Sequence, residues 1–585
     1  MSESRVPLQT ATKRTRGVRS ISISARGEPF VWLTGGGLAI ATAMIVSLLV
    51  LVLFNGARTF WPKPIVEVTL VDGTKLMGEV TRSERFRVDP AVLEQLSTVV
   101  REAIAEEDGW ATRRLVRVGN YDLYGEDFVW VPSFEIAGES TPADAWMIER
   151  REWGPAIGRP VALLLDGEPL SESGASLATQ FRGAHGSALA RYRQIRSLEK
   201  NDIGDINHEM EKVRLSVRRA AIEHGDGSAQ HQAAALEASN GEERLDDAYR
   251  LVQIHIDAIR EEDEKFRIEV RDVSGRLISD KPSDPDTPLL LSHVVRAYPA
   301  NAIGPLDRLH IYIDRWVEFL TAEPREANTE GGVWPAIFGT FMMTVIMSLV
   351  VAPFGVVTAL YLREYAKQGA VVSAVRIAVN NLAGVPSIVF GVFGLGFFCY
   401  VFGARIDQLF YPEKLPAPTY GTGGILWASL TLALLTVPVV IVATEEALAA
   451  VPRSMREGSF ACGASRWQTI WRIVLPKATP GIMTGLILAM ARGAGEVAPL
   501  MITGVVKLAP ELPFDRHFPW AHLERSFMHL GFHIYDVGFQ SRNSEAGKPM
   551  VFTTTLLLIA LIAMLNFTAI RLRNRLKKRY RSADF

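Results

Sequence analysis

The sequence predicts an all-α polytopic membrane protein with six transmembrane helices and a large α+β insert after the first helix. Two observations lead to this fold class. The 585-residue chain is 48% hydrophobic with a mean hydropathy of +0.13, which is too apolar for an ordinary soluble enzyme with this content of charged residues. Its apolar residues are also gathered into long runs with almost no charge, as membrane-spanning helices require.

Six nearly uncharged runs have about the length that a bilayer demands of a helix. The first exceeds the usual apolar region of a signal peptide, and no A-x-A cleavage site follows Phe54, so we expect an uncleaved anchor at residues 30–54. The other five belong to an expected core at residues 333–572. The six runs are Phe30–Phe54, Val333–Leu362, Leu382–Phe402, Gly423–Thr444, Gly481–Val506 and Met550–Ile570.

Lys and Arg residues beside these runs predict the orientation of the chain. They gather in the tails, residues 1–29 and 573–585, and in the connections 363–376 and 444–480, whereas the connection 402–423 is nearly neutral. Because basic flanks favour the cytoplasmic side, an even number of spans places both tails inside. A basic tail could instead bind nucleic acid, but beside a span the topological interpretation is favoured, and we expect no nucleic-acid partner.

Residues 55–332 separate the first two runs and are expected to form a soluble insert of domain size in the periplasm. The two cysteines of the chain, Cys399 and Cys462, lie elsewhere, so a disulfide framework is impossible in the insert. Alternating apolar residues on both sides of Asp72-Gly73 predict a β-hairpin, and residues 266–278 around Ser274-Gly275 predict another.

Between these hairpins, apolar residues recur at a spacing of three and four, which predicts two helices. Gly225-Asp226-Gly227 separates the two runs, so we expect an antiparallel helical hairpin on a small β-rich base. No function of the insert can be inferred from this pattern. The apolar positions are Ile203, Ile206, Met210, Val213, Val217 and Ala220 in the first run and Leu245, Ala248, Val252, Ile256 and Ile259 in the second.

Motifs for catalysis and metal binding are missing from the sequence. Gly547-Lys548 is followed by Pro549, and Arg542 stands where the first glycine of a phosphate-binding loop should be. His208-Glu209 lacks the second histidine of a metalloprotease helix, and no Cys/His cluster has zinc-ligand spacing. We therefore expect no enzyme activity, no cofactor and no metal in this chain.

The segment at about 444–480 is charged, amphipathic and divided by glycines and prolines into short helices. Bulky apolar residues between Trp467 and Ile473 form a ridge that needs a partner, which could be another protein or the lipid surface. The spacing Glu457-x5-Gly463, followed after nine residues by Ile473-x-Leu475-Pro476, resembles the EAA loop of ABC-importer permeases.

In that family, the two short helices of the loop dock in a cleft of a separate ATPase subunit. The two alanines of the motif are replaced by Gly458 and Ser459, which are also small, so close helix packing remains expected. The resemblance implies that ATP hydrolysis takes place on a partner. It assigns the coupling role to Glu457, Gly463, Ile473, Leu475 and Pro476.

A wider match, from Glu446 to Pro499 together with Leu382–Gly391, resembles the PstA-type permeases of phosphate importers. It covers roughly residues 333–572 and implies a type I ABC-importer permease core in the bacterial inner membrane. It also implies an ATPase subunit dimer, a second permease subunit, a periplasmic phosphate-binding protein and inorganic phosphate as partners. The insert at 55–332 is far larger than the corresponding loop of that family, so the resemblance implies nothing about it.

Arg492 and Glu496 lie within the fifth apolar run, four residues apart. Eleven residues into that run, at about 1.5 Å per residue, Arg492 is expected about 16 Å along a helix and near the bilayer midplane. A charge there is costly, so the two side chains are expected to pair on one helical face. The pair is either a packing contact or a waypoint for an anion, since a guanidinium suits a tetrahedral oxyanion.

Asn381 and Ser387 flank Gly384-x-Pro386 at the entry to the third run. The glycine and proline either kink the helix or expose broken backbone and polar side chains to the translocation pathway.

Two other functions remain open from the sequence. A sensory receptor also begins with a span, a large outside domain and a second span, but four further spans argue against it. A permease for another oxyanion or for phosphonate is the nearer alternative, because one arginine recognises charge more than chemical identity.

Overall fold

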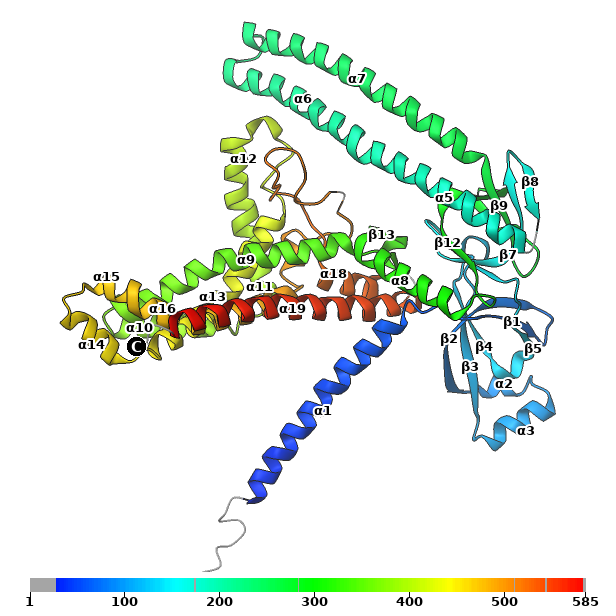
Figure 1. Ribbon diagram of the computed structural model, residues 1–585, viewed down its shortest axis with the longest axis horizontal. Helices are drawn as coiled ribbons and strands as arrows, with labels where there is room; N and C mark the ends of the chain where they lie inside the picture. Colours follow the sequence, from blue (N-terminus) through cyan, green and yellow to red (C-terminus); the bar gives the residue numbers. More distant parts are fainter. Residues whose placement is uncertain (1–27, 173–174, 282, 510, 542–543, 582–585) are drawn as a thin grey trace, which may run out of the picture. The chain divides into compact units, whose positions relative to one another are not determined.

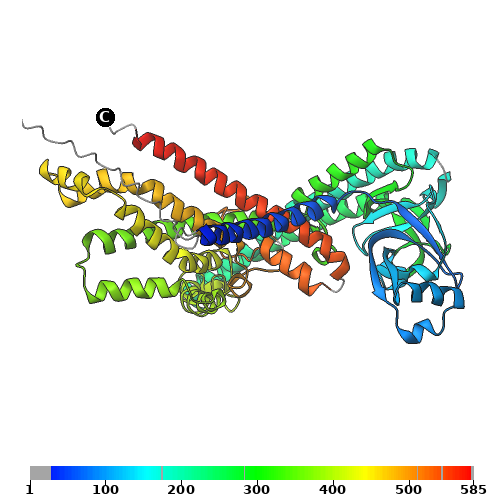
Figure 2. The same ribbon diagram turned by 90° about the horizontal axis from the view of Figure 1, so that it is seen from below.

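The structure is a computed structural model that describes residues 28–172, 175–281, 283–509, 511–541 and 544–581 (Figures 1 and 2). The chain divides into two units at Asn55. Most of α1 (Glu28–Arg58) belongs to the first unit, and it is a single apolar helix of 31 residues. All other elements belong to the second unit.

Within the described residues, six helical stretches are long and apolar enough to cross a membrane. Each overlaps one of the six apolar runs, so the predicted number of spans is confirmed. They are Trp32–Arg58, Trp334–Tyr365, Ser387–Phe410, Ile425–Ala449, Arg466–Gly495 and Ser544–Lys578. Their main helices are α9 (Trp334–Leu360), α11 (Ser387–Phe393), α12 (Ala404–Phe410), α13 (Ile425–Ala449), α16 (Leu475–Gly495) and α19 (Ser544–Arg581).

The predicted limits of the fifth span were wrong. We expected a helix over residues 481–506, but α16 begins at Leu475 and ends at Gly495. Gly493 and Gly495 are poor helix formers, and Pro499 disfavours helical backbone in the residue before it. Packing contributes as well, because a Cβ atom added at Gly493 would lie 2.4 Å from Sδ of Met347.

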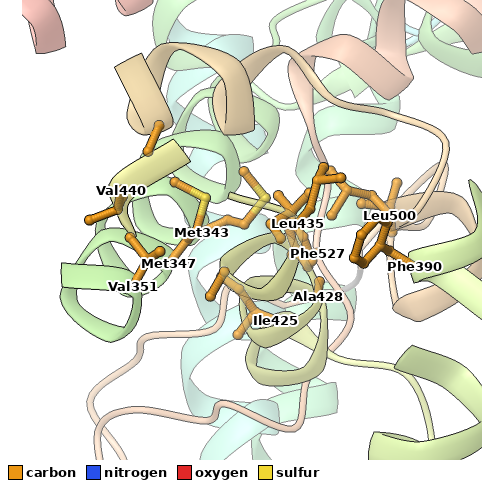
Figure 3. Close-up of a cluster of buried hydrophobic side chains, with 14 residues drawn as sticks. Met343, Met347, Val351, Phe390, Ile425, Ala428, Leu435, Val440, Leu500 and Phe527 are labelled. Carbon is orange, nitrogen blue, oxygen red and sulfur yellow. The ribbon is translucent and has the colours of Figure 1, made fainter. Parts of the chain in front are cut away.

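α13 lies at the centre of the helical core and packs against α9 and α16. Small residues allow this close approach, since a Cβ atom on Gly355 would lie 2.6 Å from Val440, and one on Gly485 would lie 2.5 Å from Ala443. Close backbone approach of this kind is how membrane helices associate without a hydrophobic driving force. Figure 3 shows the main buried cluster, whose labelled members are Met343, Met347, Val351, Phe390, Ile425, Ala428, Leu435, Val440, Leu500 and Phe527.

The α+β region contains two antiparallel sheets. The five-stranded sheet has the order β4-β3-β2-β1-β5, from β1 (Ile65–Leu70), β2 (Lys75–Arg87), β3 (Trp110–Arg117), β4 (Phe128–Pro132) and β5 (Ile136–Ser140). The seven-stranded sheet has the order β10-β11-β9-β7-β6-β12, with β8 beside β7. Its strands are β6 (Trp146–Arg150), β7 (Ala156–Leu165), β8 (Glu168–Glu172), β9 (Phe266–Arg271), β10 (Ser279–Lys281), β11 (Asp284–Leu290) and β12 (Val294–Pro299).

The first predicted β-hairpin is confirmed, with Thr69 opposite Lys75 and Gly73 in the left-handed conformation at φ 87°. The second has a short returning arm: Arg271 and Leu277 form an isolated bridge, and backbone hydrogen bonds of 2.9 Å join Arg276 to Asp272 and Ile278 to Val270.

The predicted helical hairpin is also confirmed. A continuous helix runs through α5 (Ala175–Ser197), a π-helical stretch (Leu198–Ile203) and α6 (Gly204–His224), and α7 (Ala229–Glu264) returns beside it (Figure 1). The turn contains Gly225 and Gly227 with φ of 87° and 79°, values that glycine adopts without steric cost. The apolar positions predicted for the seam are half-buried or buried, whereas their neighbours are mostly exposed.

α6 is bound to two loops of the helical core. Arg219 pairs with Glu413, and Glu211 lies 3.1 Å from Lys414, both in the connection between α12 and α13. Asp205 accepts hydrogen bonds from Arg516 at 2.7 Å and contacts His517 at 2.8 Å, in the connection between α16 and α19. The hairpin and these two connections therefore lie on one side of the core.

Short elements complete the second unit. The helices are α2 (Pro90–Leu93), α3 (Thr98–Glu106), α4 (Tyr121–Tyr124), α8 (Pro305–Thr321), α10 (Ala370–Leu382), α14 (Arg453–Ala461), α15 (Arg466–Thr469), α17 (Leu500–Thr503) and α18 (Leu530–Tyr535). β13 (Pro324–Arg325) and β14 (Glu330–Gly331) form a two-stranded sheet between α8 and α9.

Candidate functional site

Arg492 and Glu496 form an ion pair at the end of α16. Arg492 lies in the last turn of the helix, and Glu496 follows the last helical residue with φ −78° and ψ 138°. Arg492 Nε lies 3.6 Å from Glu496 Oε1, and the two side chains are 36% and 22% exposed. The pair thus forms although only one partner is helical, and both charged groups remain accessible.

The helix that carries Arg492 begins earlier than expected, so Arg492 lies about 26 Å from Leu475 along α16, at about 1.5 Å per residue, rather than about 16 Å from the start of its helix. Its expected place near the bilayer midplane stays a prediction. Its position in the last turn is favourable for a cation, because the C-terminal end of a helix carries partial negative charge. A broken helix end within a membrane protein is tolerated where it is buried in protein or lines a cavity.

The predicted residues of the third span lie around a second helix break. Asn381 is exposed near the end of α10, and Ser387 is the half-buried first residue of α11, with residues 383–386 outside both helices. α11 reaches the region of the charged pair through Gly391, where an added Cβ atom would lie 2.7 Å from Cα of Pro499. α11 therefore packs against the segment that follows Glu496, at a position five residues after the break at 383–386.

The segment after α13 folds into α14 and α15 with a turn at Gly463, whose φ is 80°. Glu457 and Gly463 are exposed, whereas Ile473, Leu475 and Pro476 are half-buried. The expectation of two separate short helices was only half right, because α15 continues through a π-helical stretch into α16. Ser465 starts this continuous helix with a capping box.

This segment is held firmly against the core. Arg456 donates to Glu364 Oε1 at 2.9 Å and to the carbonyl oxygens of Val451 and Leu448 at 2.7 and 2.9 Å. Ser459 and Thr469 join α14 to α15 through a buried hydrogen bond of 2.9 Å. The sequence pattern did not identify Glu364, whose only signal was a charge placed directly after an apolar run.

Two tryptophan rings on the segment face solvent. Trp467 and Trp471 stack with their ring centroids 5.6 Å apart and an interplanar angle of 19°, and their side chains are 57% and 58% exposed. Phe460 on α14 is 47% exposed. Exposed aromatic residues beside a rigid, charged loop are typical of protein interfaces. We name the surface formed by Glu457, Phe460, Gly463, Trp467 and Trp471 the coupling surface.

In the part of the chain that the structure describes, no group of three or more His, Cys, Asp and Glu residues could hold a metal ion.

Comparison with known proteins assigns the helical core. The profile of the family described as "Binding-protein-dependent transport system inner membrane component" matches residues 351–582. The match covers α10 to α19, and with them the coupling surface and the Arg492–Glu496 pair.

Three curated relatives illustrate the similarity. The probable ABC transporter permease protein YqgI of Bacillus subtilis is 30% identical over 39% of this chain and 74% of its own length. The probable ABC transporter permease protein YqgH of the same species is 34% identical over 34% of this chain and 62% of its own length. The phosphate transport system permease protein PstA of Mycobacterium leprae is 38% identical over 32% of this chain and 54% of its own length.

The chain thus spans less than two thirds of YqgH and of the M. leprae PstA, and none of the three matches extends over the whole chain. The core has the helical ABC-importer permease fold, and the α+β region is additional to it. On this evidence the chain is a multi-pass inner membrane protein that belongs to the family of binding-protein-dependent transport system inner membrane components.

Proposed function

We propose that this protein is the permease subunit of a phosphate importer. It forms half of a translocation pathway with a second permease subunit, receives phosphate from a periplasmic binding protein and is driven by a separate ATPase dimer. The observation that carries the proposal is the accessible Arg492–Glu496 pair at the broken end of α16. The similarity to PstA permeases supports phosphate as the transported ion.

Arg492 supplies what an oxyanion requires. Its guanidinium presents several donors in a planar fork, which can hold two phosphate oxygens at once. The distance of 3.6 Å to Glu496 is longer than a good charge-assisted hydrogen bond, so the arginine can exchange its carboxylate partner for a passing anion. Glu496 then recovers the arginine when phosphate leaves, which prevents the anion from binding too tightly for transport.

The neighbouring helix break extends the proposed pathway. α11 touches the segment after Glu496 through Gly391 and Pro499, and the break before α11 brings Asn381 and Ser387 to the surface of the core. Amide and hydroxyl groups can donate to phosphate oxygens without adding charge, so they suit a position that the ion leaves readily.

The coupling surface is the proposed docking site for the ATPase. Its loop is braced by Arg456 and by the bond between Ser459 and Thr469, so a movement of the partner is transmitted to the membrane helices instead of being absorbed locally. The continuity of α15 with α16 gives the shortest route, because the same helix that carries Trp467 ends at the Arg492–Glu496 pair.

In the proposed topology, the coupling surface and both termini lie in the cytoplasm and residues 55–332 lie in the periplasm, as the basic flanks of the spans favour. The α+β insert docks the binding protein or a partner loop and performs no chemistry. Its location beside the connections that follow α12 and α17 supports this role, because a binding protein must deliver its ion on the same side.

Uptake measurements test the proposal directly. The complete complex is reconstituted in vesicles, with the binding protein supplied on the periplasmic side of the permease and ATP on the opposite side. Uptake of radiolabelled phosphate, sulfate and molybdate is then compared. We expect ATP-dependent uptake of phosphate and at least tenfold slower uptake of the other two anions. Faster uptake of sulfate or molybdate would assign another oxyanion, and uptake of none would refute the importer assignment for these ions.

A further inference from the structure

The buried side chain of Asn328 joins the α+β insert to Lys507 and Asp536, close to the segment that carries the Arg492–Glu496 pair. Phe319 of the insert packs in the same region, in one cluster with Met528, Leu530 and Val537. We propose that Asn328 is a positioning residue, by which the insert fixes the segment that supports the charged pair. The transport consequence of this inference rests on the proposed function, whereas the structural connection does not.

Asn328 is held in an unusual backbone conformation between β13 and β14. Glu326, Ala327 and Asn328 have φ angles of 41°, 50° and 76°. Three successive residues other than glycine in the left-handed region are strained, and such strain persists only where the surroundings enforce it. The strained turn directs the Asn328 side chain away from the insert and into the helical core.

The amide group of Asn328 bridges two parts of the core. Its Nδ2 donates to the carbonyl oxygen of Lys507 at 3.2 Å and to Oδ2 of Asp536 at 3.0 Å. Lys507 Nζ lies 3.2 Å from the same carboxylate oxygen. Asn328 and Asp536 are each only 1% exposed, so a lost bond is not replaced readily by water and leaves a buried polar group unsatisfied.

Asp536 belongs to a short segment that lies between the membrane helices α9 and α19. It follows α18 directly, and Leu530 at the start of α18 donates its N–H to Oγ1 of Thr340 on α9 at 2.9 Å. Two glycines make this close packing possible. A Cβ atom on Gly339 would lie 2.1 Å from the carbonyl oxygen of Met528, and one on Gly531 would lie 2.7 Å from Cγ2 of Val497.

Val497 is the neighbour of Glu496 in the chain, so α18 packs against the backbone that carries the charged pair. The route from the insert runs from Asn328 to Asp536 through a hydrogen bond, along the backbone of α18 to Gly531, and from Gly531 to Val497 through packing. Packed interiors transmit displacements instead of absorbing them, and an Asn328 that moves must shift α18 or break its bond to Asp536.

Both halves of the insert meet at this strained turn. Arg117 of the five-stranded sheet donates to Glu330 on β14 at 2.9 Å. Lys200, at the base of the helical hairpin, lies 2.8 Å from Glu323 immediately before β13. A displacement of either the sheet or the hairpin is thus transmitted to the turn that contains Asn328. Through this residue, docking of a partner on the insert would shift the segment beside the pathway.

The first test measures amide hydrogen exchange in the purified full-length chain, without phosphate or ATP. Asn328→Ala should raise exchange of the amides of α18 and of residues 536–540 at least tenfold. Asn328→Asp should raise exchange of these amides by at least the same factor, because the carboxylates of residues 328 and 536 would then face each other. The control Asn240→Ala, at an exposed position on α7, should leave exchange within twofold of the unaltered protein.

A reciprocal exchange of the two side chains distinguishes positioning from general damage. In the double variant Asn328→Asp with Asp536→Asn, the amide and carboxylate trade places and Lys507 Nζ can still pair with the acid, but the bond to the Lys507 carbonyl oxygen is lost. Exchange in α18 should therefore fall at least threefold below that of Asn328→Asp. The proposal would be overturned if the double variant failed to rescue, or if the α18 amides exchanged at the same rate in Asn328→Ala as in the control. Faster amide exchange throughout the core in Asn328→Ala would also overturn it.

The reconstituted complex gives the second readout. The single variants should lower the maximum rate of phosphate uptake at least tenfold with the subunits still assembled, and the double variant should recover at least a third of the rate. Normal uptake by both single variants would refute the role in transport. If the unaltered complex imports no phosphate, the proposed function fails, and the exchange results alone decide whether Asn328 positions α18.

Discussion

The buried charge cluster around Glu149 should contribute strongly to the stability of the α+β insert. Glu149 lies on β6 and is contacted by Arg296 on β12 and by Arg315 on α8, whose Nε donates to it at 2.8 Å. Arg315 also donates to the hydroxyl of Tyr298 at 2.7 Å and to the carbonyl oxygen of Phe60 at 2.9 Å. The cluster therefore joins the seven-stranded sheet to the helix that leads into α9.

The pKa of Glu149 gives the magnitude. Burial by itself raises the pKa of this carboxyl, but the Arg315 and Arg296 guanidinium groups outweigh it and lower the pKa from 4.5 to about 2. A difference of this size corresponds to about 3 kcal/mol between the ionised and neutral forms. Removing one partner from a buried pair costs about 3 to 5 kcal/mol in general, so we expect Glu149→Gln to lower the local unfolding free energy by about 3 kcal/mol.

The sign of the pH dependence follows from the lowered pKa. A carboxyl whose folded-state pKa lies below its ordinary value stabilises the fold in full above about pH 5. Its contribution is lost as the pH falls from the ordinary value of 4.5 toward the folded-state value of about 2. Glu149→Gln should remove this part of the acid sensitivity of the insert, while the unaltered protein loses stability across that range.

Amide hydrogen exchange in β6 and β12 measures the effect at neutral pH. About 3 kcal/mol is more than a hundredfold in the opening equilibrium, so exchange there should be faster by roughly that factor in Glu149→Gln. Glu139→Gln is the matched control, because Glu139 pairs with Arg114 at 2.9 Å but is 38% exposed, and exposed pairs contribute about 1 kcal/mol or less. Exchange in Glu149→Gln within threefold of the control would refute the reasoning.

Three further predictions concern transport and topology. In the assembled complex, Arg492→Gln should lower phosphate uptake at least a hundredfold, and Arg492→Lys at least tenfold because a point charge lacks the planar fork. The control Arg405→Gln on α12 should leave uptake nearly unchanged. Normal uptake by Arg492→Gln would mean that the pair has a structural role only. Gly463→Trp should uncouple ATP hydrolysis from uptake, and Gly463→Ala separates the effect of bulk from the cost of φ 80° at this position; equal uptake by Trp and Ala variants would exclude a steric role. In intact cells, an impermeant maleimide should label Ser239→Cys but not the exposed native Cys462, and the opposite pattern would reverse the proposed orientation.

Much of the fold could be predicted because its signals are local. A run of apolar residues identifies a membrane helix wherever it lies, and the seam of the α6–α7 hairpin follows from the three-four spacing of residues such as Val213 and Val252. The turn at Gly73 was equally readable, since a left-handed residue between two alternating segments favours glycine. The motif and the apolar ridge of residues 444–480 led to the proposed coupling role, which stays a prediction.

The exact setting of the candidate site was not predictable in this way. Arg492 was expected within a long helix, but α16 ends three residues later, where Gly493 packs against Met347. The pairing with Glu496 survives because the next residues remain close in space even when the helix has ended. Apolar content marked residues 496–506 as part of a span, but α16 ends before them, and their helical part is the separate short helix α17 (Leu500–Thr503).

The sequence by itself therefore determined the membrane class, the number of candidate spans and the hairpin of the insert, and it supplied the residues that are proposed for coupling and anion binding. The tertiary structure alone decided where α16 ends, how α15 joins it and which side chains of the insert, Asn328 among them, contact the core. Asn328 and Asp536 are 208 positions apart, and the sequence around either residue does not indicate that the two are in contact. Periodicity and composition report on residues within a few turns of one another, whereas a buried contact between distant segments depends on how the whole chain packs.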